Sequence, residues 1–264
     1  MKIIVCIKQV PCTSQVQVDE KTGVLKRDGV ESKINPYDLY ALETAIWLRE
    51  RLPGATTVAL TMGPPQAEQS LREAFMMGID EAVLVSDKRF AGADVLATSR
   101  ALSQAILAIG DMGLILCGQQ TTDGDTAQVG SEIAEFLDIP HAANVTAIID
   151  ADQTKITAEL DLPVTTETIR MQIPCLLCVN KGIHTPRLPS FKRKKETRDR
   201  KITVLTLKDL PDSNPAHYGL DGSPTQVIRI FPPEHHVSHK TWEGPGDELA
   251  DRLCQHLRTQ KFIK

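Results

Sequence analysis

The residues best suited to chemistry lie in one segment, LILCGQQTTDGDTAQVG, at positions 114–130. The segment begins as an apolar strand that ends at Gly118 and continues as a polar loop with hydroxyls and carboxylates. A helix is expected from about Asp125, because Asp125 and Gln128 have the spacing of a capping box. The start of a helix leaves backbone N–H groups unpaired and carries partial positive charge. The segment therefore predicts an anion site at a strand-to-helix turn.

The loop in this segment carries side chains that suit a nucleotide. Its hydroxyls can donate to phosphate oxygens, and they belong to Thr121, Thr122 and Thr126. Asp123 can accept hydrogen bonds from ribose hydroxyls, and the glycines at 124 and 130 allow a close approach of backbone or ligand. A well-capped turn that binds nothing has the same local pattern. The segment is neither a P-loop nor a GxGxxG fingerprint.

Two other strand ends carry turns that can accommodate a ligand. A strand expected at 3–7 continues into KQVP at 8–11, and a strand expected at 57–61 continues into MGPP at 62–65. The carboxyl ends of parallel strands share one edge of a sheet, and ligands bind in the crevice outside that edge. Three such turns on one edge predict a binding site there, although they do not name the ligand.

The elements around these turns alternate between strand and helix. Apolar runs predict strands at 3–7, 57–61, 82–85 and 113–117. Helical spacing predicts helices from Pro36 to Pro53 and at 93–109, prolines suited to a first turn open another at 63–77, and a fourth is expected at 127–137. A small hairpin is expected at 15–27. Strands separated by helices of this length form a mostly parallel sheet, so the fold class is α/β.

The pattern changes after Pro140. Four further strands are expected to form an antiparallel addition to the sheet, at 145–149, 155–160, 165–173 and 176–179. A basic loop, a proline-rich irregular stretch and a last helix follow, at 186–201, 211–233 and 247–258. An irregular stretch of this length is unusual inside a compact domain, so we expect this tail to lie on a partner.

The bulk composition argues against several classes of protein. A net charge of −4 and an aromatic content of 4% argue against nucleic-acid binding. No apolar run approaches the roughly 20 residues that a membrane span needs. The opening MKIIVCIKQV lacks the pattern of a signal or transit peptide, so a cytoplasmic location is expected.

Neither a metal site nor a disulfide framework is expected. Cys175 and Cys178 have the spacing of metal ligands, but they lie in the apolar run IPCLLCV, where residues three apart on a strand face opposite sides. The histidines at 235, 236 and 239 lack an apparent partner cluster and suit a surface loop. The six cysteines are scattered, so reduced thiols are expected. No catalytic acid, base or nucleophile is evident.

An ordered set of motifs resembles the beta (small) subunit of electron-transfer flavoproteins over essentially the full length. The matching pieces are IIVCIKQVP, INPYDLYALETAIWL, TMGPPQAEQSLREAFMMGIDEAVLV, GQQTTDGDTAQVG, ETIRMQIPCLLCV and PRLPSFKRKK. The resemblance implies a Rossmann-like nucleotide-binding domain over 1–205, with a mostly parallel sheet and helices on both faces. It also implies a C-terminal extension, 206–264, that contacts an alpha subunit.

The nucleotide site of that family, transferred by position, covers the strand ends above and the start of the first helix. Its expected members are Cys6, Asn35, Pro36, Tyr37, Asp38, Met62, Gly63, Gln119, Gln120, Thr121, Thr122, Asp123, Gly124, Asp125, Thr126, Ala127, Gln128, Val129 and Gly130. Mitochondrial-type members hold AMP and have a different loop motif. The motif GQQTTDGDTAQVG is similar to that of electron-bifurcating and nitrogen-fixation-associated members, in which the site holds the ADP half of a second FAD.

The resemblance implies flavin-based bifurcation with NADH as the electron donor. One electron is expected to pass to ferredoxin or flavodoxin, and the other through the alpha-subunit FAD to an acyl-CoA or related dehydrogenase. The redox chemistry belongs to the flavin, and the protein sets geometry and electrostatics. Two alternatives stay open: an AMP-binding electron-transfer subunit that does not bifurcate, and a non-redox adenine-nucleotide-binding module.

The basic segment at 187–201 has three interpretations. In the family it resembles the loop that docks a dehydrogenase, here 184–201, with a leucine anchor that matches Leu188 beside Pro189. An exposed leucine flanked by charge suits an interface anchor with electrostatic steering around it. A solvated surface and a nucleic-acid patch are the alternatives, and docking is the preferred interpretation.

Overall fold

The computed structural model describes residues 1–12, 31–228 and 239–264. Its internal contacts divide the chain into two compact units, Met1–Arg229 and Ile230–Lys264, and each is described by itself. The hairpin expected at 15–27 lies outside the described residues, as do His235 and His236.

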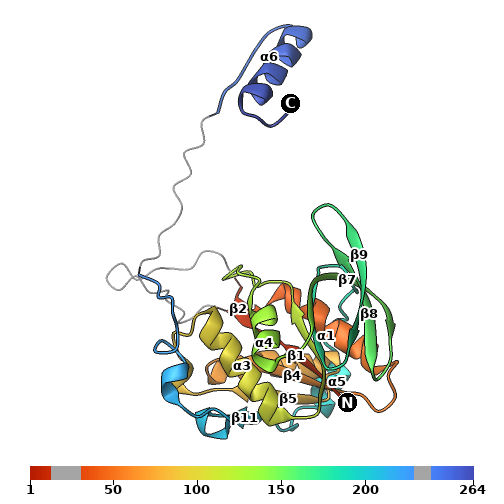
Figure 1. Cartoon of the computed structure of the whole chain (residues 1–264), viewed down its shortest axis with the longest axis vertical. Helices are drawn as coiled ribbons and strands as arrows, with labels where there is room; N and C mark the ends of the chain where they lie inside the picture. Colours follow the sequence, from red (N-terminus) through yellow and green to blue (C-terminus); the bar gives the residue numbers. More distant parts are fainter. Residues whose placement is uncertain (13–30, 229–238) are drawn as a thin grey trace. The chain divides into compact units, whose positions relative to one another are not determined.

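A nine-stranded sheet forms the centre of the first unit (Figure 1). Its strands in spatial order are β11 (Thr203–Leu205), β5 (Glu81–Val85), β4 (Thr56–Met62), β1 (Lys2–Cys6), β6 (Met112–Gly118), β10 (Cys175–Val179), β7 (His141–Ala151), β8 (Lys155–Asp161) and β9 (Thr166–Gln172). Neighbours from β11 to β7 are parallel, and β7, β8 and β9 pair antiparallel. The expected α/β class with a mostly parallel sheet is therefore confirmed.

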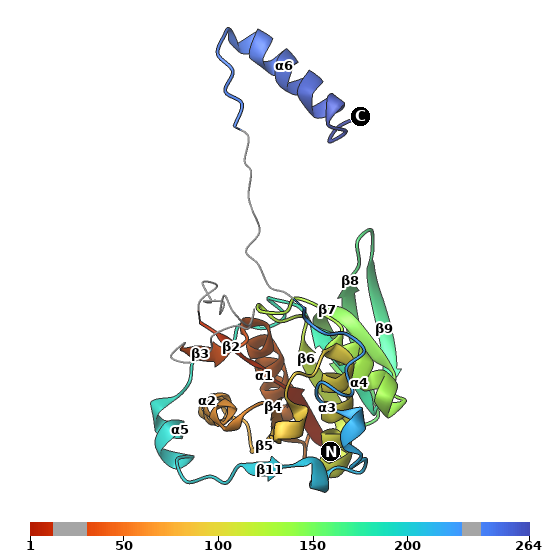
Figure 2. The same cartoon turned by 90° about the vertical axis from the view of Figure 1, so that its left-hand side faces the viewer.

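Helices cover both faces of this sheet (Figure 2). One face carries α1 (Pro36–Arg49) and α2 (Glu68–Met77), and the other carries α3 (Val95–Ile109) and α4 (Val129–Leu137). Leu42 and Phe75 belong to the core on the first side, and Ile106 and Ile133 belong to the core on the second. The expected arrangement with helices on both faces is confirmed.

Strand β1 lies at the middle of the sheet and explains the position of the crevice. Its residues alternate between the two cores, with Ile3 and Val5 on one side and Ile4 and Cys6 on the other. This is why a continuous apolar run predicts it. The chain proceeds from β1 outward to β4 and β5, and then returns to β6 on the other side of β1. Such a reversal of strand order opens a crevice at the carboxyl ends of the strands.

Strand β10 corrects the expected antiparallel addition. It lies between β6 and β7 and is parallel to both, instead of joining an antiparallel group. All five of its residues, CLLCV, are buried, as suits a strand covered on both faces. Beyond β7, β8 and β9 each pair antiparallel with the strand before them, and they project as an arm (Figure 1).

The basic segment contains more regular structure than the expected loop at 186–201. Residues Phe191–Glu196 form a short helix, α5, whose N-cap Ser190 accepts a hydrogen bond from the Arg193 N–H. Strand β11, which the sequence did not predict, then pairs with β5 at the edge of the sheet. Near the start of the chain, β2 (Gln9–Pro11) and β3 (Ser32–Ile34) form a separate antiparallel pair.

The irregular stretch after β11 packs on its own unit as far as the buried Ser223, and Thr225 is still hydrogen-bonded to Asp94. Leu207, Leu210 and Tyr218 are buried in the same core as α3. Tyr218 also donates a hydrogen bond to the Asp212 carbonyl at 2.5 Å. Because these apolar side chains find a core within the chain, the first unit extends to Arg229 and includes part of the expected extension at 206–264.

The second unit contains α6 (Gly246–Thr259), close to the helix expected at 247–258. Leu249, Leu253 and Leu257 recur every four residues and share one side of it. No described helix is long and apolar enough to cross a membrane. Contact of this unit with an alpha subunit stays a prediction.

Candidate functional site

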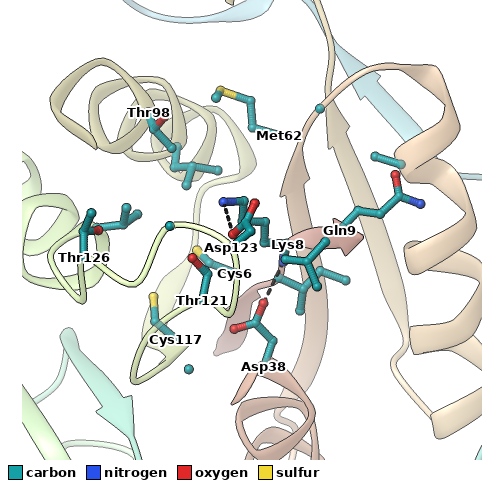
Figure 3. A pocket seen from close by; sticks show the side chains of 18 of the residues that line it. Cys6, Lys8, Gln9, Asp38, Met62, Thr98, Cys117, Thr121, Asp123 and Thr126 are labelled. Carbon is teal, nitrogen blue, oxygen red and sulfur yellow. Dashed lines mark hydrogen bonds and ion pairs between the residues drawn. The ribbon is translucent and has the colours of Figure 1, made fainter. Parts of the chain in front are cut away.

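The carboxyl ends of β1, β4 and β6 border a cavity of about 1050 Å³ (Figure 3). Its wall combines the loop after β1, the turn after β4, the loop after β6 and the first turns of α3 and α4. The reversal of strand order between β1 and β6 favours a ligand at this position. The three strand ends that the sequence groups together therefore meet around one cavity.

The loop after β6 reaches α4 by a path that corrects the expected capping box. Helix α4 begins at Val129, and Asp125 does not cap it. Asp125 and Ala127 have φ angles of 54° and 55°, in the left-handed region that a right-handed helix cannot contain. The Asp125 carboxylate instead accepts a hydrogen bond from the side chain of Gln120. The first turn of α4 still lines the cavity, and its leading N–H groups have no partner within the helix.

Asn35 is fully buried and ties this loop to the start of α1. Its Nδ2 donates to the Gln120 carbonyl at 2.8 Å and to the Asp38 carboxylate at 2.9 Å. Its Oδ1 accepts from the Thr122 N–H at 3.2 Å. Its own N–H donates to the Lys8 carbonyl at 2.8 Å. One amide side chain and its backbone therefore hold the loops after β1 and β6 against α1.

Asp38 lies on the cavity wall in the first turn of α1 and is almost completely buried. Its carboxylate accepts from the Lys8 N–H at 2.7 Å as well as from Asn35. Burial raises the pKa of Asp38 to about 7, because these hydrogen bonds only partly offset the cost of a buried charge. A Cβ at Gly118 would lie 2.5 Å from Asp38 Oδ1. Glycine is therefore required where β6 passes this carboxylate.

Lys8 reaches from the loop after β1 to the loop after β6. Its Nζ lies 2.7 Å from Asp123 Oδ1, and a dashed line marks this contact in Figure 3. Burial would raise the pKa of Asp123, but the hydrogen bond and charge of Lys8, together with hydrogen bonds from Thr121 and the backbone, outweigh burial and lower it. Lys8 lines the cavity, although it was not among the expected site residues. The turn KQVP was the signal that pointed to it.

Three thiols lie in a row at the carboxyl end of the sheet. Cys6, Cys117 and Cys178 occupy registered positions on β1, β6 and β10, and the first two line the cavity. A hydrogen bond with Cys117, together with burial, raises the pKa of Cys178 well above its ordinary value. Cys175 belongs to the opposite core, so the expected divergence of Cys175 and Cys178 is confirmed. A Cβ at Gly130 would lie 2.3 Å from Cys178 Sγ, so glycine lets α4 approach β10 closely.

The first turn of α3 forms a side of the cavity that the sequence did not predict. Asp94 caps this helix by accepting from the Ala97 N–H at 3.0 Å. Its other carboxylate oxygen accepts from the Thr225 N–H at 3.1 Å and hydroxyl at 2.7 Å. The Asp94 N–H donates to Ser223 Oγ at 2.8 Å. The end of the first unit is therefore fastened to the rim of the cavity.

Known proteins resemble this chain along its whole length. The model of the electron transfer flavoprotein domain matches residues 22–210. The chain belongs to the electron transfer flavoprotein family.

Relatives within the electron transfer flavoprotein family align with almost the whole of this chain, and almost the whole of each relative is covered. Caffeyl-CoA reductase-Etf complex subunit CarD of Acetobacterium woodii and the electron transfer flavoprotein subunit beta of Thermoanaerobacterium thermosaccharolyticum are each 43% identical, with 100% of both chains covered. Protein FixA of Sinorhizobium fredii is 43% identical over 97% of this chain and 93% of its own. The expected similarity to the beta-subunit branch, with its nitrogen-fixation-associated members, is confirmed.

Most residues that the electron transfer flavoprotein resemblance implies for the site lie on the cavity wall. They are Cys6, Asp38, Met62, Gly63, Gln119, Gln120, Thr121, Asp123, Gly124, Thr126, Ala127, Gln128, Val129 and Gly130. The remaining members lie outside the lining, and they are Asn35, Pro36, Tyr37, Thr122 and Asp125. Asn35 and Thr122 still shape the wall, because they hydrogen-bond to each other behind it. Binding of a nucleotide by this set stays a prediction.

The segment that resembles a docking loop presents Leu188 with 86% of its surface exposed, next to an exposed Pro189. The preceding residue, Arg187, is fixed on α1. Its N–H and guanidinium donate to the buried Glu43 carboxylate at 2.8–3.1 Å, and its Nη1 lies 3.1 Å from Glu50 Oε1. Burial would raise the pKa of Glu43, but Arg187 outweighs burial and lowers it. This ion pair holds Leu188 in an exposed position.

The described part of the chain holds no group of three or more His, Cys, Asp or Glu side chains suited to a metal ion. All six cysteines are free. The cavity wall instead offers hydroxyls, amides and backbone N–H groups, which can bind and orient a ligand.

Proposed function

We propose that this chain is the beta subunit of a bifurcating electron-transfer flavoprotein and holds the adenosine diphosphate half of an FAD in the cavity. The observation that supports this most strongly is that three strand ends and two helix N-termini surround one cavity of about 1050 Å³. A bound flavin supplies the electron-transfer chemistry, and the residues of this chain bind and orient it.

The chemistry of the wall suits a nucleotide with phosphates. Thr121 and Thr126 would donate to phosphate oxygens, together with the leading N–H groups of α4. Asp123 would accept hydrogen bonds from ribose hydroxyls. Met62 and Leu102 add apolar surface to the same wall, where the base would be shielded from water. Phosphate, ribose and base therefore each find suitable groups around one cavity.

The proposal extends to the electron donors, acceptors and partners. NADH would be the donor, and ferredoxin or flavodoxin would be one acceptor. The alpha subunit would carry a second FAD, which serves an acyl-CoA or related dehydrogenase. The name of CarD supports this class of partner, because CarD belongs to a caffeyl-CoA reductase-Etf complex. Leu188 would anchor the dehydrogenase, and the leucines of α6 would contact the alpha subunit.

The test is to purify the chain together with its alpha subunit and count the cofactors after denaturing extraction. The proposal expects two FAD for each heterodimer. One FAD with one AMP would show an electron-transfer subunit that does not bifurcate. A colourless complex that binds ATP would instead support a non-redox adenine-nucleotide module and contradict both electron-transfer interpretations.

A further inference from the structure

The charge of the cavity wall is unusual for a site that would hold phosphates. Among the described residues that line it, Lys8 is the single Lys or Arg. Four carboxylates share the wall, and they belong to Glu31, Asp38, Asp94 and Asp123. Among the described charged side chains of this wall, only the ammonium group of Lys8 therefore attracts an anionic ligand.

The backbone and the side chain of Lys8 are held in different ways. Its N–H donates to the buried Asp38 carboxylate at 2.7 Å, and its carbonyl accepts from the Asn35 N–H at 2.8 Å. Its side chain is 46% exposed and ends 2.7 Å from Asp123, whose side chain is 28% exposed. A Cβ at Gly124 would lie 3.9 Å from Lys8 Nζ, so the ammonium group lies against the turn that contains Thr121. The backbone of Lys8 is therefore fixed by hydrogen bonds, while the ion pair of its side chain with Asp123 is accessible to solvent.

The carboxylates of the wall differ in how firmly they are engaged. Asp38 accepts from the Lys8 N–H and from Asn35 inside the protein. Asp94 caps α3 and accepts from Thr225. Asp123 pairs with a half-exposed lysine and also accepts from the Thr121 hydroxyl, and ion pairs of this exposed kind contribute little net stability. Of these contacts, the Lys8–Asp123 ion pair therefore costs the least free energy to break.

We propose that Lys8 exchanges anions, so that a phosphate of the bound nucleotide takes the place of the Asp123 carboxylate at its ammonium group. The inference rests on the proposed function and adds a specific phosphate ligand to it. An ammonium group has three donors, and a diphosphate offers more charge and more acceptors than one carboxylate. The displaced Asp123 becomes free to accept from a ribose hydroxyl. Lys8 thus makes the site select phosphorylated nucleosides over adenosine.

The exchange is tested by titrating the full chain with ADP and, separately, with adenosine. The ratio of the two dissociation constants reports the phosphate contribution together with the ribose contact that the exchange frees, because the remaining effects on base and ribose cancel. We expect Lys8→Met to lower the preference for ADP by at least about tenfold, the usual scale of a hydrogen bond to a charged group. Asp123→Asn should raise that preference, because it removes the competing anion. Lys33→Met, an equal charge change on the neighbouring strand β3 and outside the lining, should leave it unchanged.

The outcomes separate the two levels of the proposal. Binding of neither ligand by the wild-type chain would overturn the proposed function, and the exchange with it. Wild-type binding of ADP together with an unchanged preference in Lys8→Met would overturn the exchange alone. A lowered preference in Asp123→Asn would also overturn it, because Asp123 would then assist the phosphate instead of competing with it. Circular dichroism of each variant confirms that it is folded.

Discussion

Helix α1 holds two loops, one at its start and one near its middle, and it does so with different chemistry. At its start, the amide of Asn35 is completely buried and binds the loop after β6. In its second half, the carboxylate of Glu43 binds Arg187, which precedes the exposed Leu188. The first contact is neutral, and the second is an ion pair with an arginine whose side chain is 33% exposed.

The difference separates a rigid wall from an adjustable surface. A buried neutral amide with satisfied donors and acceptor is expensive to disturb and does not titrate. An ion pair near the surface is weakened by salt and depends on the ionisation of its carboxylate. We therefore expect the Asn35 contacts of the nucleotide wall to be insensitive to salt, and the segment around Leu188 to respond to it.

The largest effect is expected for Asn35→Ala. This change leaves the Gln120 carbonyl and the Thr122 N–H without their partner, so the free energy of unfolding should fall by about 2–4 kcal/mol. Nucleotide content should fall with it. Urea unfolding and cofactor extraction measure the two effects, with Gln172→Ala on the exposed side of β9 as the control. An unchanged free energy of unfolding and an unchanged nucleotide content in Asn35→Ala would show that Asn35 does not hold the wall together.

The next effect concerns pH. The pKa of Asp38 is raised from 3.8 to about 7, so its contribution to stability is present below the lower value and is lost as pH rises to the upper one. The stability difference between wild type and Asp38→Asn should therefore fall by about 1–3 kcal/mol between about pH 5 and about pH 8. Urea unfolding across this range measures it.

A pH control comes from the other contact of α1. The pKa of Glu43 is lowered, so its contribution is present above its unfolded value and is lost only as pH falls further. The difference between wild type and Glu43→Gln should be flat over the same neutral range. If the stability difference changed with pH for Glu43→Gln and stayed constant for Asp38→Asn, the roles assigned to the two carboxyl groups would be reversed.

A smaller effect is expected at the ion pair itself. Glu43→Gln should cost about 1–2 kcal/mol, because a buried carboxylate loses its charge while Arg187 keeps part of its hydration. Glu50→Gln, which removes the more exposed partner of the same guanidinium, should cost under about 1 kcal/mol. Thermal unfolding in low and high salt compares the two variants. Equal losses would show that burial does not distinguish the two carboxylates.

The smallest effect on stability is expected at Leu188. Leu188→Asp should change the free energy of unfolding by less than about 0.5 kcal/mol, because the side chain is exposed. Flavin content should be normal, while reduction of the dehydrogenase becomes slow. Val164→Asp, at an equally exposed valine, is the matched control. A wild-type rate of dehydrogenase reduction in Leu188→Asp would contradict a docking role for Leu188.

The fold could be predicted wherever the signal is local. Continuous apolar runs predicted β1, β4, β5 and β6, helical spacing predicted α1 and α3, and the turns and strands before them predicted α2 and α4. The rule that parallel strands share a carboxyl edge then located the cavity from three turns. Strand β10 was the exception, because a buried run of five residues does not reveal which neighbours it will join.

The features that escaped prediction depend on contacts between distant residues. The loop before α4 does not form the expected capping box, because Asp125 and Ala127 adopt the left-handed conformation. The same loop is held at Thr122 by Asn35, which lies 87 residues away. The rim at Asp94 depends on Thr225, which lies 131 residues away. Such pairs have no local pattern, so propensity and spacing cannot find them.

The central claim is that the adenosine diphosphate half of an FAD lies in the cavity at the ends of β1, β4 and β6. A crystal structure of the chain with its alpha subunit and FAD tests this most directly. The account predicts density for the diphosphate beside Thr126 and the first turn of α4, with the adenosine inside the cavity. A cavity filled by side chains, with the coenzyme bound elsewhere on the complex, would contradict it.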